Sequence, residues 1–324
     1  MNAVLSAAAL ALSGMLLSSQ LHAEPKRPEC IAPAKPGGGF DITCKLAQMG
    51  LRDEGLLKSP IRVTYMPGGI GAVAYNAVVA QRPKDAGLIT AWSSGSLLNL
   101  AQGKFGRYDE KAVRWLAAVG TDYGAVTVRA DSPFRTLDDL IAALKKDPSG
   151  TVIGAGGTVG SQDWMQVALL ARSAGVDPKA LRYVAFEGGG EPITALLGGH
   201  VQAITSGIGE TVVQRDAGKV RILAVMSDER LPGGLANVPT AKESGLDVSW
   251  PIIRGFYMGP QVSDEDYNWW KQQFDVLLAS DTFGKLREQR DLLPFSMTGD
   301  ELKDYVYKQV AQYKSLADEF GLIQ

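Results

Sequence analysis

Few residues of this sequence have the types and spacing that covalent chemistry requires. A nucleophile elbow (G-x-S-x-G), a zinc-protease motif (H-E-x-x-H) and a C-x-x-C redox pair are all absent from the 324 residues. His200 follows two glycines at an expected helix-to-strand turn, where a structural role is favoured. Asp41 and Glu187 could act as acid and base, yet each adjoins a glycine turn where helix capping explains it. The sequence therefore favours binding over catalysis.

Four glycine-rich loops, by contrast, lie where helices are expected to begin. Such loops present unpaired backbone N–H groups and the positive end of a helix dipole, which together can hold a carboxylate or a phosphate. Nearby hydroxyl groups could add hydrogen bonds, and contacts from a second lobe would require the lobes to close on the ligand. The loops are residues 36–41, 67–71, 156–161 and 187–190, and the hydroxyls belong to Ser93, Ser94, Ser96, Thr158, Ser161 and Ser206.

Two nucleotide-binding motifs resemble parts of these loops, and neither is complete. A P-loop needs Gly-Lys-Ser/Thr after its glycines, whereas Phe40 and Asp41 follow here. The stretch GAGGTVG (154–160) is one residue too long for G-x-G-x-x-G, although a strand precedes it and a helix follows. Glu187 ends the next strand, where a ribose-binding acid could lie. A nucleotide-cofactor α/β enzyme therefore stays open as an alternative.

The composition is that of an ordinary globular protein. The chain is 45% hydrophobic and 21% charged with a net charge of -2, and it has no basic cluster, so no nucleic-acid partner is expected. Residues 1–23 carry no Asp, Glu, Lys or Arg, and their apolar run is too short to span a membrane. We predict a signal peptide that is cleaved after about Ala23, and hence an exported protein; a buried N-terminal helix is the alternative.

Cys30 and Cys44 are the two cysteines, and they flank the first glycine loop. In an exported protein such a pair is expected to form a disulfide, which would stabilise the fold by roughly 3 kcal/mol. Two free buried thiols are the alternative. Because a zinc site needs further ligands and no histidine is near, no metal site is expected. The disulfide would pin the first strand to the first helix.

Short apolar runs alternate with helical patterns, which predicts parallel sheets covered by helices. Capping residues begin several helices, and two helices are expected to finish the chain. We predict two α/β lobes joined by two crossings, with the ligand cleft between them: lobe 1 comprises residues 24–125 plus 251–324, and lobe 2 comprises residues 126–250. The expected caps are Thr136 with Asp139, Ser161, Ser263, and Thr298 with Glu301.

Several of these stretches together resemble one family, the periplasmic substrate-binding subunits of tripartite tricarboxylate transporters, also known as Bug-type extracytoplasmic solute receptors. The resemblance covers essentially the whole chain after the leader. Its most specific part is the pair P-G-G-x-x-D and P-G-G-x-G, and the triple-glycine loop between two cysteines is similar to the citrate-type branch. The stretches are CIAPAKPGGGFDITC, RVTYMPGGIGAVAYNAVVAQRP, SSGSLLNLAQGKFGRY, VRWLAAVGTDYG, VIGAGGTVGSQDWMQ, YVAFEGGGEPITALLGGHVQ and WPIIRGFYMGP.

The resemblance implies a type II-like periplasmic-binding-protein fold, no enzymatic activity, no cofactor, and a monomer that delivers citrate or a related tricarboxylate to a two-subunit integral-membrane permease. Alternatives are a dicarboxylate or other carboxylate as ligand, and a role as a sensor that a signalling partner reads. Lys35 and Arg254 are the nearest cations for ligand charge, each with an ion-pair role equally open. The implied ligand-binding residues are Gly38, Gly39, Phe40, Asp41, Ile70, Gly71, Ser93, Ser94, Thr158, Gly160, Ser161, Glu187 and Gly188.

Overall fold

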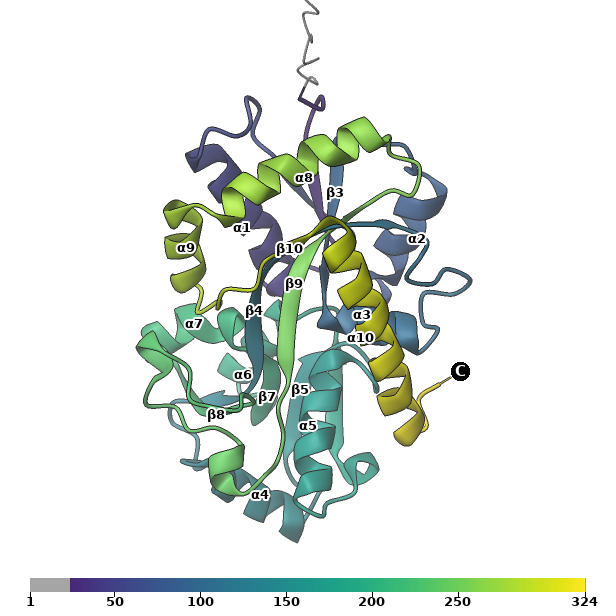
Figure 1. The fold of residues 1–324 in the computed structure, drawn as a ribbon. Coiled ribbons are helices and arrows are strands. Elements are labelled where there is room, and N and C mark those ends of the chain that lie inside the picture. The colour runs from purple at the N-terminus through teal and green to yellow at the C-terminus, as the bar shows by residue number, and fades with distance from the viewer. Residues whose placement is uncertain (1–23, 324) are drawn as a thin grey trace, which may run out of the picture.

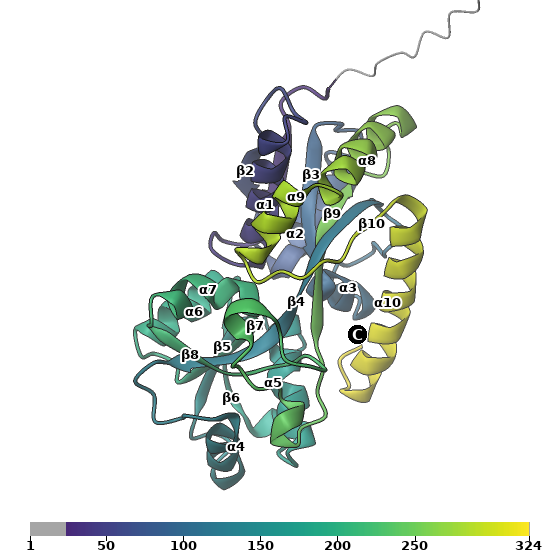
Figure 2. The ribbon, with the colours of Figure 1, turned by 60° about the vertical axis from the view of Figure 1, so that its left-hand side comes forward.

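The chain folds into alternating strands and helices that form two lobes. This computed structural model describes residues 24–323, so the predicted signal peptide and its cleavage site lie outside the described residues. Figure 1 and Figure 2 show one lobe above the other, with two long strands passing between them. The predicted two-lobed α/β architecture with two crossings is confirmed.

The first lobe, at the top of Figure 1, is built on a mixed sheet. Strand β1 runs parallel to β2 and β3, whereas β9 is antiparallel to β3 and β4. In spatial order the strands are β2 (Arg62–Tyr65), β1 (Glu29–Ala32), β3 (Leu88–Ser93), β9 (Pro251–Met258) and β4 (Arg114–Arg129), with β10 (Met297–Thr298) paired to β4. The helices are α1 (Gly39–Asp53), α2 (Ala72–Ala80), α3 (Ser94–Ala101), α8 (Asp264–Leu278), α9 (Asp281–Glu288) and α10 (Gly299–Glu319).

The second lobe repeats the plan with its own core, in which Trp164, Met165 and Leu223 are buried. Strand β5 lies between β6 and β7 and is parallel to both, and β4 pairs antiparallel with β7 and β8. These strands are β5 (Val152–Gly156), β6 (Arg182–Phe186), β7 (Ala203–Gly207) and β8 (Val220–Val225); the helices are α4 (Leu137–Lys146), α5 (Gln162–Ser173), α6 (Gly190–Leu197) and α7 (Ile208–Asp216).

Strand β4 is the longer of the two crossings. Its 16 residues span about 50 Å at about 3.3 Å per residue, which is enough to run through both lobes. The part from Arg114 to Tyr123 pairs with β9, and the part from Gly124 onward pairs with β7 and β8. Asp122 on β4 and Arg254 on β9 therefore lie where the chain passes from one lobe to the other.

The last helix also connects the lobes. Helix α10 packs against α3 and β4 of the first lobe, and Tyr313 on it stacks on Trp250 with ring centroids 5.9 Å apart. Phe320, just after α10, meets Trp164 of the second lobe edge-on at 6.0 Å. Aromatic pairs of this kind are worth about 0.5–1.5 kcal/mol beyond their buried area, so the C-terminal segment helps to set the relative position of the lobes.

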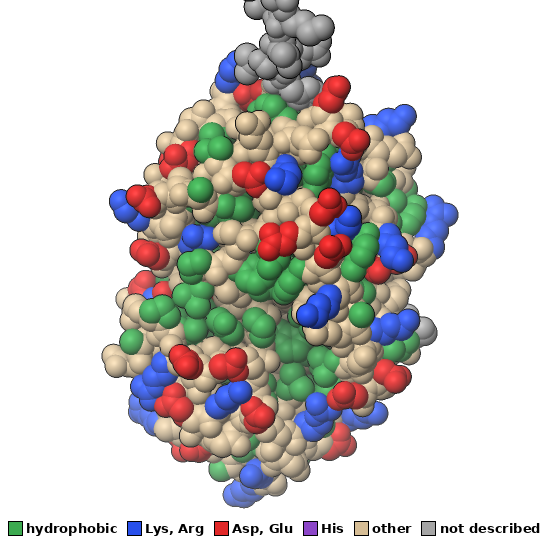
Figure 3. Space-filling view, in the orientation of Figure 1, with side chains coloured by type: hydrophobic (Ala, Val, Ile, Leu, Met, Phe, Trp, Pro, Cys, Tyr) green, Lys and Arg blue, Asp and Glu red, His purple; other side chains and the backbone are tan. Residues whose placement is uncertain are grey.

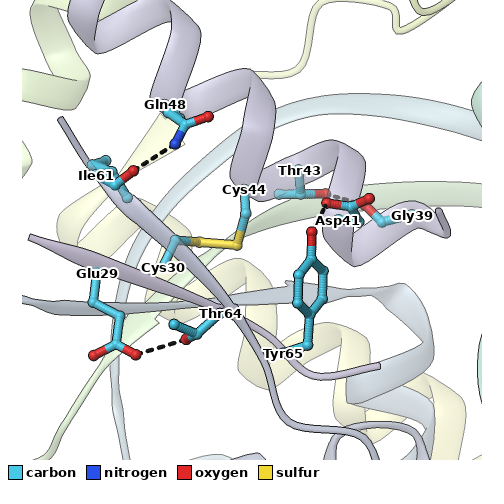
Figure 4. The surroundings of a disulfide bond; sticks show 10 residues. All are labelled: Glu29, Cys30, Gly39, Asp41, Thr43, Cys44, Gln48, Ile61, Thr64 and Tyr65. Carbon is cyan, nitrogen blue, oxygen red and sulfur yellow. Dashed lines mark hydrogen bonds between the residues drawn. A yellow bond between two sulfur atoms is a disulfide. The ribbon is translucent and has the colours of Figure 1, made fainter. Parts of the chain in front are cut away.

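The predicted disulfide between Cys30 and Cys44 is present and fully buried. Figure 4 shows that it joins the first strand, β1, to the first helix, α1, next to the glycine loop. The two cysteines are 14 residues apart, and the enclosed segment contains that loop. The cross-link therefore limits how far the loop can move relative to the sheet.

Some local predictions are confirmed and others are wrong. Thr136, Ser161 and Ser263 cap helices as predicted, and Thr136 forms the capping box with Asp139. Thr298 begins α10 without the predicted side-chain cap, and its hydroxyl donates to Asp275. The chain ends with three helices, α8, α9 and α10, where two were predicted. Helices α3 and α7 were not predicted either, since each begins within a short stretch rich in Ser or Gly, 93–96 and 207–209, of the kind that also forms loops.

Candidate functional site

The first glycine loop ends at the N-terminus of α1 and forms one wall of a cleft between the lobes. Gly38, Gly39 and Phe40 line the innermost part of this cleft. The first N–H groups of a helix lack partners within the helix. Gly38 is the N-cap, with no side chain to satisfy them. This wall therefore offers backbone donors, and the positive helix end, to an anion.

Asp41 fixes the shape of this loop from inside. One of its carboxylate oxygens accepts hydrogen bonds from the N–H of Gly37 and from Nζ of Lys45, both at 2.8 Å. The other oxygen accepts from the hydroxyl of Tyr65 at 2.9 Å, as Figure 4 shows. The side chain is thus fully engaged, and it leaves only the backbone N–H of Asp41 for the ligand contact that the sequence predicts.

The second glycine loop holds an isoleucine in an unusual conformation. Ile70 has φ 45° and ψ 59° between Gly69 and Gly71, which also have positive φ. A β-branched residue in the left-handed region costs about 1–3 kcal/mol, and such strain collects at functional sites. Ile70 lies against Gly157 of the second lobe, and its carbonyl accepts from Asn99 at 3.3 Å. Its strained backbone thus places an apolar side chain at the centre of the cleft.

The second-lobe wall is formed by the loop between β5 and α5. The Ser161 hydroxyl caps α5, accepting from the N–H of Trp164, and it donates to the carbonyl of Gly156 at 2.8 Å. Tyr183 donates to the carbonyl of Gly157 at 2.7 Å, and burial raises the pKa of this hydroxyl. These bonds make the loop a rigid counterpart to the first-lobe loops.

The two walls touch, so the structure is that of a closed cleft. Lys35 forms an ion pair with Glu191 across the opening at 2.7 Å. Gln102 and Lys104 of the first lobe donate to the carbonyls of Gly160 and Val159 at 2.8 and 3.0 Å. The backbones of the first and fourth glycine loops also meet, with no room for a side chain at Gly38.

Two cavities lie in the closed cleft and share Ile70 in their walls. The inner cavity measures about 40 Å³ and the outer cavity about 430 Å³. Of the residues predicted to bind ligand, Gly38, Gly39, Phe40, Ile70, Ser93 and Gly188 line the inner cavity, and Ile70, Thr158, Ser161 and Glu187 line the outer one. Asp41, Gly71, Ser94 and Gly160 line neither: Ser94, for example, accepts a hydrogen bond from the N–H of Ile253 instead.

The floor of the inner cavity holds four buried charged residues: Arg254, Asp122, Glu210 and Asp163. Nη2 of Arg254 donates to Asp122 at 2.8 Å and to Glu210 at 3.4 Å. Asp163 accepts from the N–H of Gly156 at 3.0 Å and from Gln162 at 3.3 Å. Arg254, Glu210 and Asp163 line the cavity. We call these four residues the floor cluster.

Burial dominates the ionisation of the floor cluster. Burial raises the pKa of Glu210 to about 8. Attraction by Arg254 opposes this rise, and repulsion from Asp163 and Asp122 partly cancels that attraction. Burial likewise raises the pKa of Asp163 to about 6, against its hydrogen bonds from Gln162 and Gly156. The pKa of Asp122 is also raised by burial, although Arg254 opposes the shift. The cluster therefore holds fewer negative charges at neutral pH than its three carboxyl groups suggest.

The sequence pointed to Arg254 only as one of two candidate cations, and it missed Asp122, Asp163 and Glu210. A signal did exist for two of them. Arg254 is a lone charge in the apolar stretch WPIIRGFYMGP, and Asp122 is a lone charge between apolar runs of a crossing strand. Charged residues are seldom fully buried unless they are paired, so such isolated charges mark a site. Asp163 and Glu210 lie among polar helix residues, so the sequence does not distinguish them from ordinary surface acids.

Residues 24–323 show neither a membrane-spanning helix nor a metal site. None of the helices in this range is long and apolar enough to cross a bilayer, and no group of three or more His, Cys, Asp or Glu side chains in it is arranged to hold a metal ion. On the face shown in Figure 3, basic and acidic side chains are interspersed. The cleft, lined by the N-terminus of α1 and by Arg254, is the candidate binding site.

Two lobes, two crossing strands and a cleft lined by helix N-termini define a solute-binding protein with a periplasmic-binding-protein fold. The chain belongs to the tripartite tricarboxylate transporter family of receptors (TctC), whose family model matches residues 56–322. It is 27% identical to Protein BugT of Bordetella pertussis over 319 residues, which cover 96% of this chain and 95% of BugT.

Solved structures show the same fold. The periplasmic binding protein BugD has a TM-score of 0.83 at 22% identity, with 93% of this chain and 99% of BugD covered. MatC of Rhodopseudomonas palustris with bound malate has a TM-score of 0.78 at 20% identity, with 89% of this chain and 98% of MatC covered.

Membership of the family decides the class of function. Its members are substrate-binding receptors and not enzymes, which removes the nucleotide-dependent enzyme as an alternative. They bind carboxylate ligands and work with a membrane permease, and membership of this receptor family implies export to the periplasm.

Proposed function

We propose that this receptor captures a citrate-like tricarboxylate in the cleft and delivers it to the permease of a tripartite tricarboxylate transporter. The observation that carries the proposal is the convergence of two anion-binding features on the inner cavity. A side chain added at Gly39 would lie 1.9 Å from Nη1 of Arg254, so the guanidinium sits directly on the N-terminus of α1. A carboxylate placed there would meet backbone amides and a cation together.

A dicarboxylate is the second candidate, and the charges in the cleft favour it. Arg254 is the one cation that lines the inner cavity among residues 24–323. Lys104, the cation that lines the outer cavity in the same range, already donates to the carbonyl of Val159, and burial lowers its pKa. A third ligand carboxylate would have to lie near Glu187 and Glu191, which also line the outer cavity. MatC, with the same fold, has been solved with malate.

The inner cavity is too small for either ligand, whereas the outer cavity falls within the range of small-molecule sites. We therefore place one carboxylate in the inner cavity and the rest of the ligand in the outer one. The ligand-binding residues that we propose are the members of the predicted set that line the two cavities, with Arg254 added. We further propose that the protein is a monomer, with one lobe at 24–125 plus 251–324 and the other at 126–250. It is exported with cleavage after about Ala23 and docks to a two-subunit permease. In the sensor alternative, a signalling partner would detect the same closure of the lobes.

Calorimetry of the protein purified from the periplasm tests this function. The panel is citrate, tricarballylate, malate, nicotinate and NAD. We expect citrate or malate to bind with a micromolar dissociation constant, and deletion of the gene to abolish uptake of the ligand that binds. Binding of NAD without any response to carboxylates would overturn the proposal, as would a complete lack of carboxylate binding. Retained uptake after deletion would favour the sensor role.

A further inference from the structure

The floor cluster contains more acids than bases. Three carboxyl groups, on Asp122, Asp163 and Glu210, share one guanidinium, that of Arg254, within the described residues. The side chains of Asp122, Arg254 and Glu210 are 0, 3 and 5% exposed. A buried ion without a counter-charge is expensive, and the usual outcome is that the group takes up a proton.

Glu210 is the member of the cluster with the fewest partners. Its Oε1 accepts the longer of the two hydrogen bonds from Arg254, at 3.4 Å, whereas Asp122 accepts the shorter one. Its Oε2 is buried and has no hydrogen-bond partner among residues 24–323, and the same holds for Nε of Arg254. Both residues line the inner cavity. Two residues of the cavity lining thus each keep one buried polar atom without a partner, a donor on Arg254 and a carboxyl oxygen on Glu210.

The position of Glu210 is also tightly defined. Its Oε2 lies against the backbone of Gly189, where an added side-chain carbon would be only 1.5 Å away. Gly189 lines the same cavity. The carboxyl group is therefore held at the cavity wall by packing, and a neutral carboxyl group held in this way can donate a hydrogen bond to an anion.

Resting on the proposed carboxylate-binding function, we propose that Glu210 contacts the ligand as a neutral acid. Its protonated carboxyl group donates a hydrogen bond to the ligand carboxylate that Arg254 also binds. In this arrangement the ligand meets one cation and one neutral donor, so a carboxylate can be bound beside an acidic cluster. The proton comes from solvent and stays on Glu210, and no covalent bond changes.

Affinity then depends on pH in a defined direction. Burial raises the pKa of Glu210 to about 8, so the acid is protonated below this pH and becomes a repelling carboxylate above it. Binding is therefore strong below pH 8 and weakens by about tenfold for each pH unit above it. Three charged groups face Glu210 from the elements packed around it: Arg254 on β9, Asp122 on β4 and Asp163 on α5. Three more line a neighbouring cavity that Glu210 also lines: Asp41 and Lys45 on α1, and Arg290 after α9.

The experiment is calorimetry of the full exported protein with malate and with citrate between pH 7 and pH 9.5. Simple carboxylic acids ionise well below most of this range, so titration above pH 8 reports on the protein. Each titration is repeated in buffers of different ionisation enthalpy, which gives the number of protons bound with the ligand. We expect this number to rise from about 0.1 at pH 7 to about 0.9 at pH 9, as one group with a pKa near 8 requires.

The variant Glu210→Gln keeps a neutral donor of the same shape. We expect it to bind at pH 7 within a few-fold of wild type and to lose the proton uptake and the pH dependence above pH 8. Glu191→Gln is the matched control. Glu191 is paired with Lys35 at the rim, and this pairing lowers the pKa of Glu191. The control variant can bind the ligand with a different affinity, but its affinity should depend on pH above pH 8 as that of the wild type does.

The outcomes separate the two proposals. Absence of binding to every carboxylate overturns the proposed function, and this inference with it. Binding that is independent of pH, with no proton uptake by the wild type, overturns the inference alone and needs no variant. Unchanged proton uptake in a folded Glu210→Gln protein also overturns it, because another group would then hold the proton.

Discussion

Gly38 is the residue at which closure of the cleft is most directly testable. Its φ of -98° suits any residue, so Ala is compatible with the local backbone. In the closed structure, however, the added carbon would lie 2.9 Å from the backbone nitrogen of Gly189 and 3.3 Å from that of Gly190. These are backbone atoms of the opposite lobe and cannot turn away. Gly38→Ala should therefore oppose closure without disturbing either lobe.

The expected magnitude follows from the contact. A carbon normally stays about 3.5 Å or more from a non-bonded heavy atom, so the lobes must separate by several tenths of an ångström or accept the overlap. Overpacking of this kind costs about 1–3 kcal/mol, which corresponds to roughly 5- to 150-fold weaker binding. The cost falls on the closed form alone, so the free energy of unfolding of the ligand-free open form should hardly change.

The assay combines calorimetry with the best ligand of the carboxylate panel and small-angle scattering with and without that ligand. Gly284→Ala is the matched control: Gly284 lies in α9 and has open space around its added carbon. We expect the control to bind as wild type does and to gain up to about 1 kcal/mol of stability. Wild-type affinity and full compaction in Gly38→Ala would refute closure of these two loops onto each other.

Three further predictions concern the scaffold. Replacing Cys30 and Cys44 by Ala should lower the free energy of unfolding by about 3 kcal/mol, measured in urea, because the 14-residue separation sets the entropy of the closed loop. Arg254→Met should lower the free energy of unfolding, measured in urea, by about 3–5 kcal/mol at pH 7.5. The loss should be smaller at pH 5.5, where the carboxyl groups left without a counter-charge can take up protons; an equal loss at the two pH values would contradict this. Since folding raises the pKa of Glu210, the folded state binds the extra proton, so wild-type stability should fall between pH 5 and pH 8. Glu210→Gln should flatten that slope in urea unfolding followed across this range.

Much of the fold was predictable because it depends on local patterns. The alternation of apolar runs and helices predicted the lobes, and two long apolar stretches predicted the crossings at β4 and β9. The disulfide could be predicted because Cys30 and Cys44 have no competitors for pairing. Helices α3, α7 and α9 were missed, since helices of only eight or nine residues owe their stability to tertiary packing more than to their own sequence.

Part of the candidate site could likewise be predicted from local sequence, and part could not. The glycine loops at Gly38 and Ile70 were recognisable because their special backbone geometry demands particular residue types close together in sequence. Which of those residues line the cavities could not be recognised from the sequence, since Gly71 and Ser94 belong to the same motifs yet line neither cavity of the cleft.

The sequence by itself determined most of the elements, the cross-link, the glycine-rich loops and the family of receptors to which the chain belongs. The tertiary structure decided the floor of the cleft. Asp122, Asp163, Glu210 and Arg254 come from four elements spread over more than 130 positions, and only folding brings them together at the inner cavity. Their charge states depend on how much water the surrounding chain excludes, and that is a property of the assembled cleft and not of any segment.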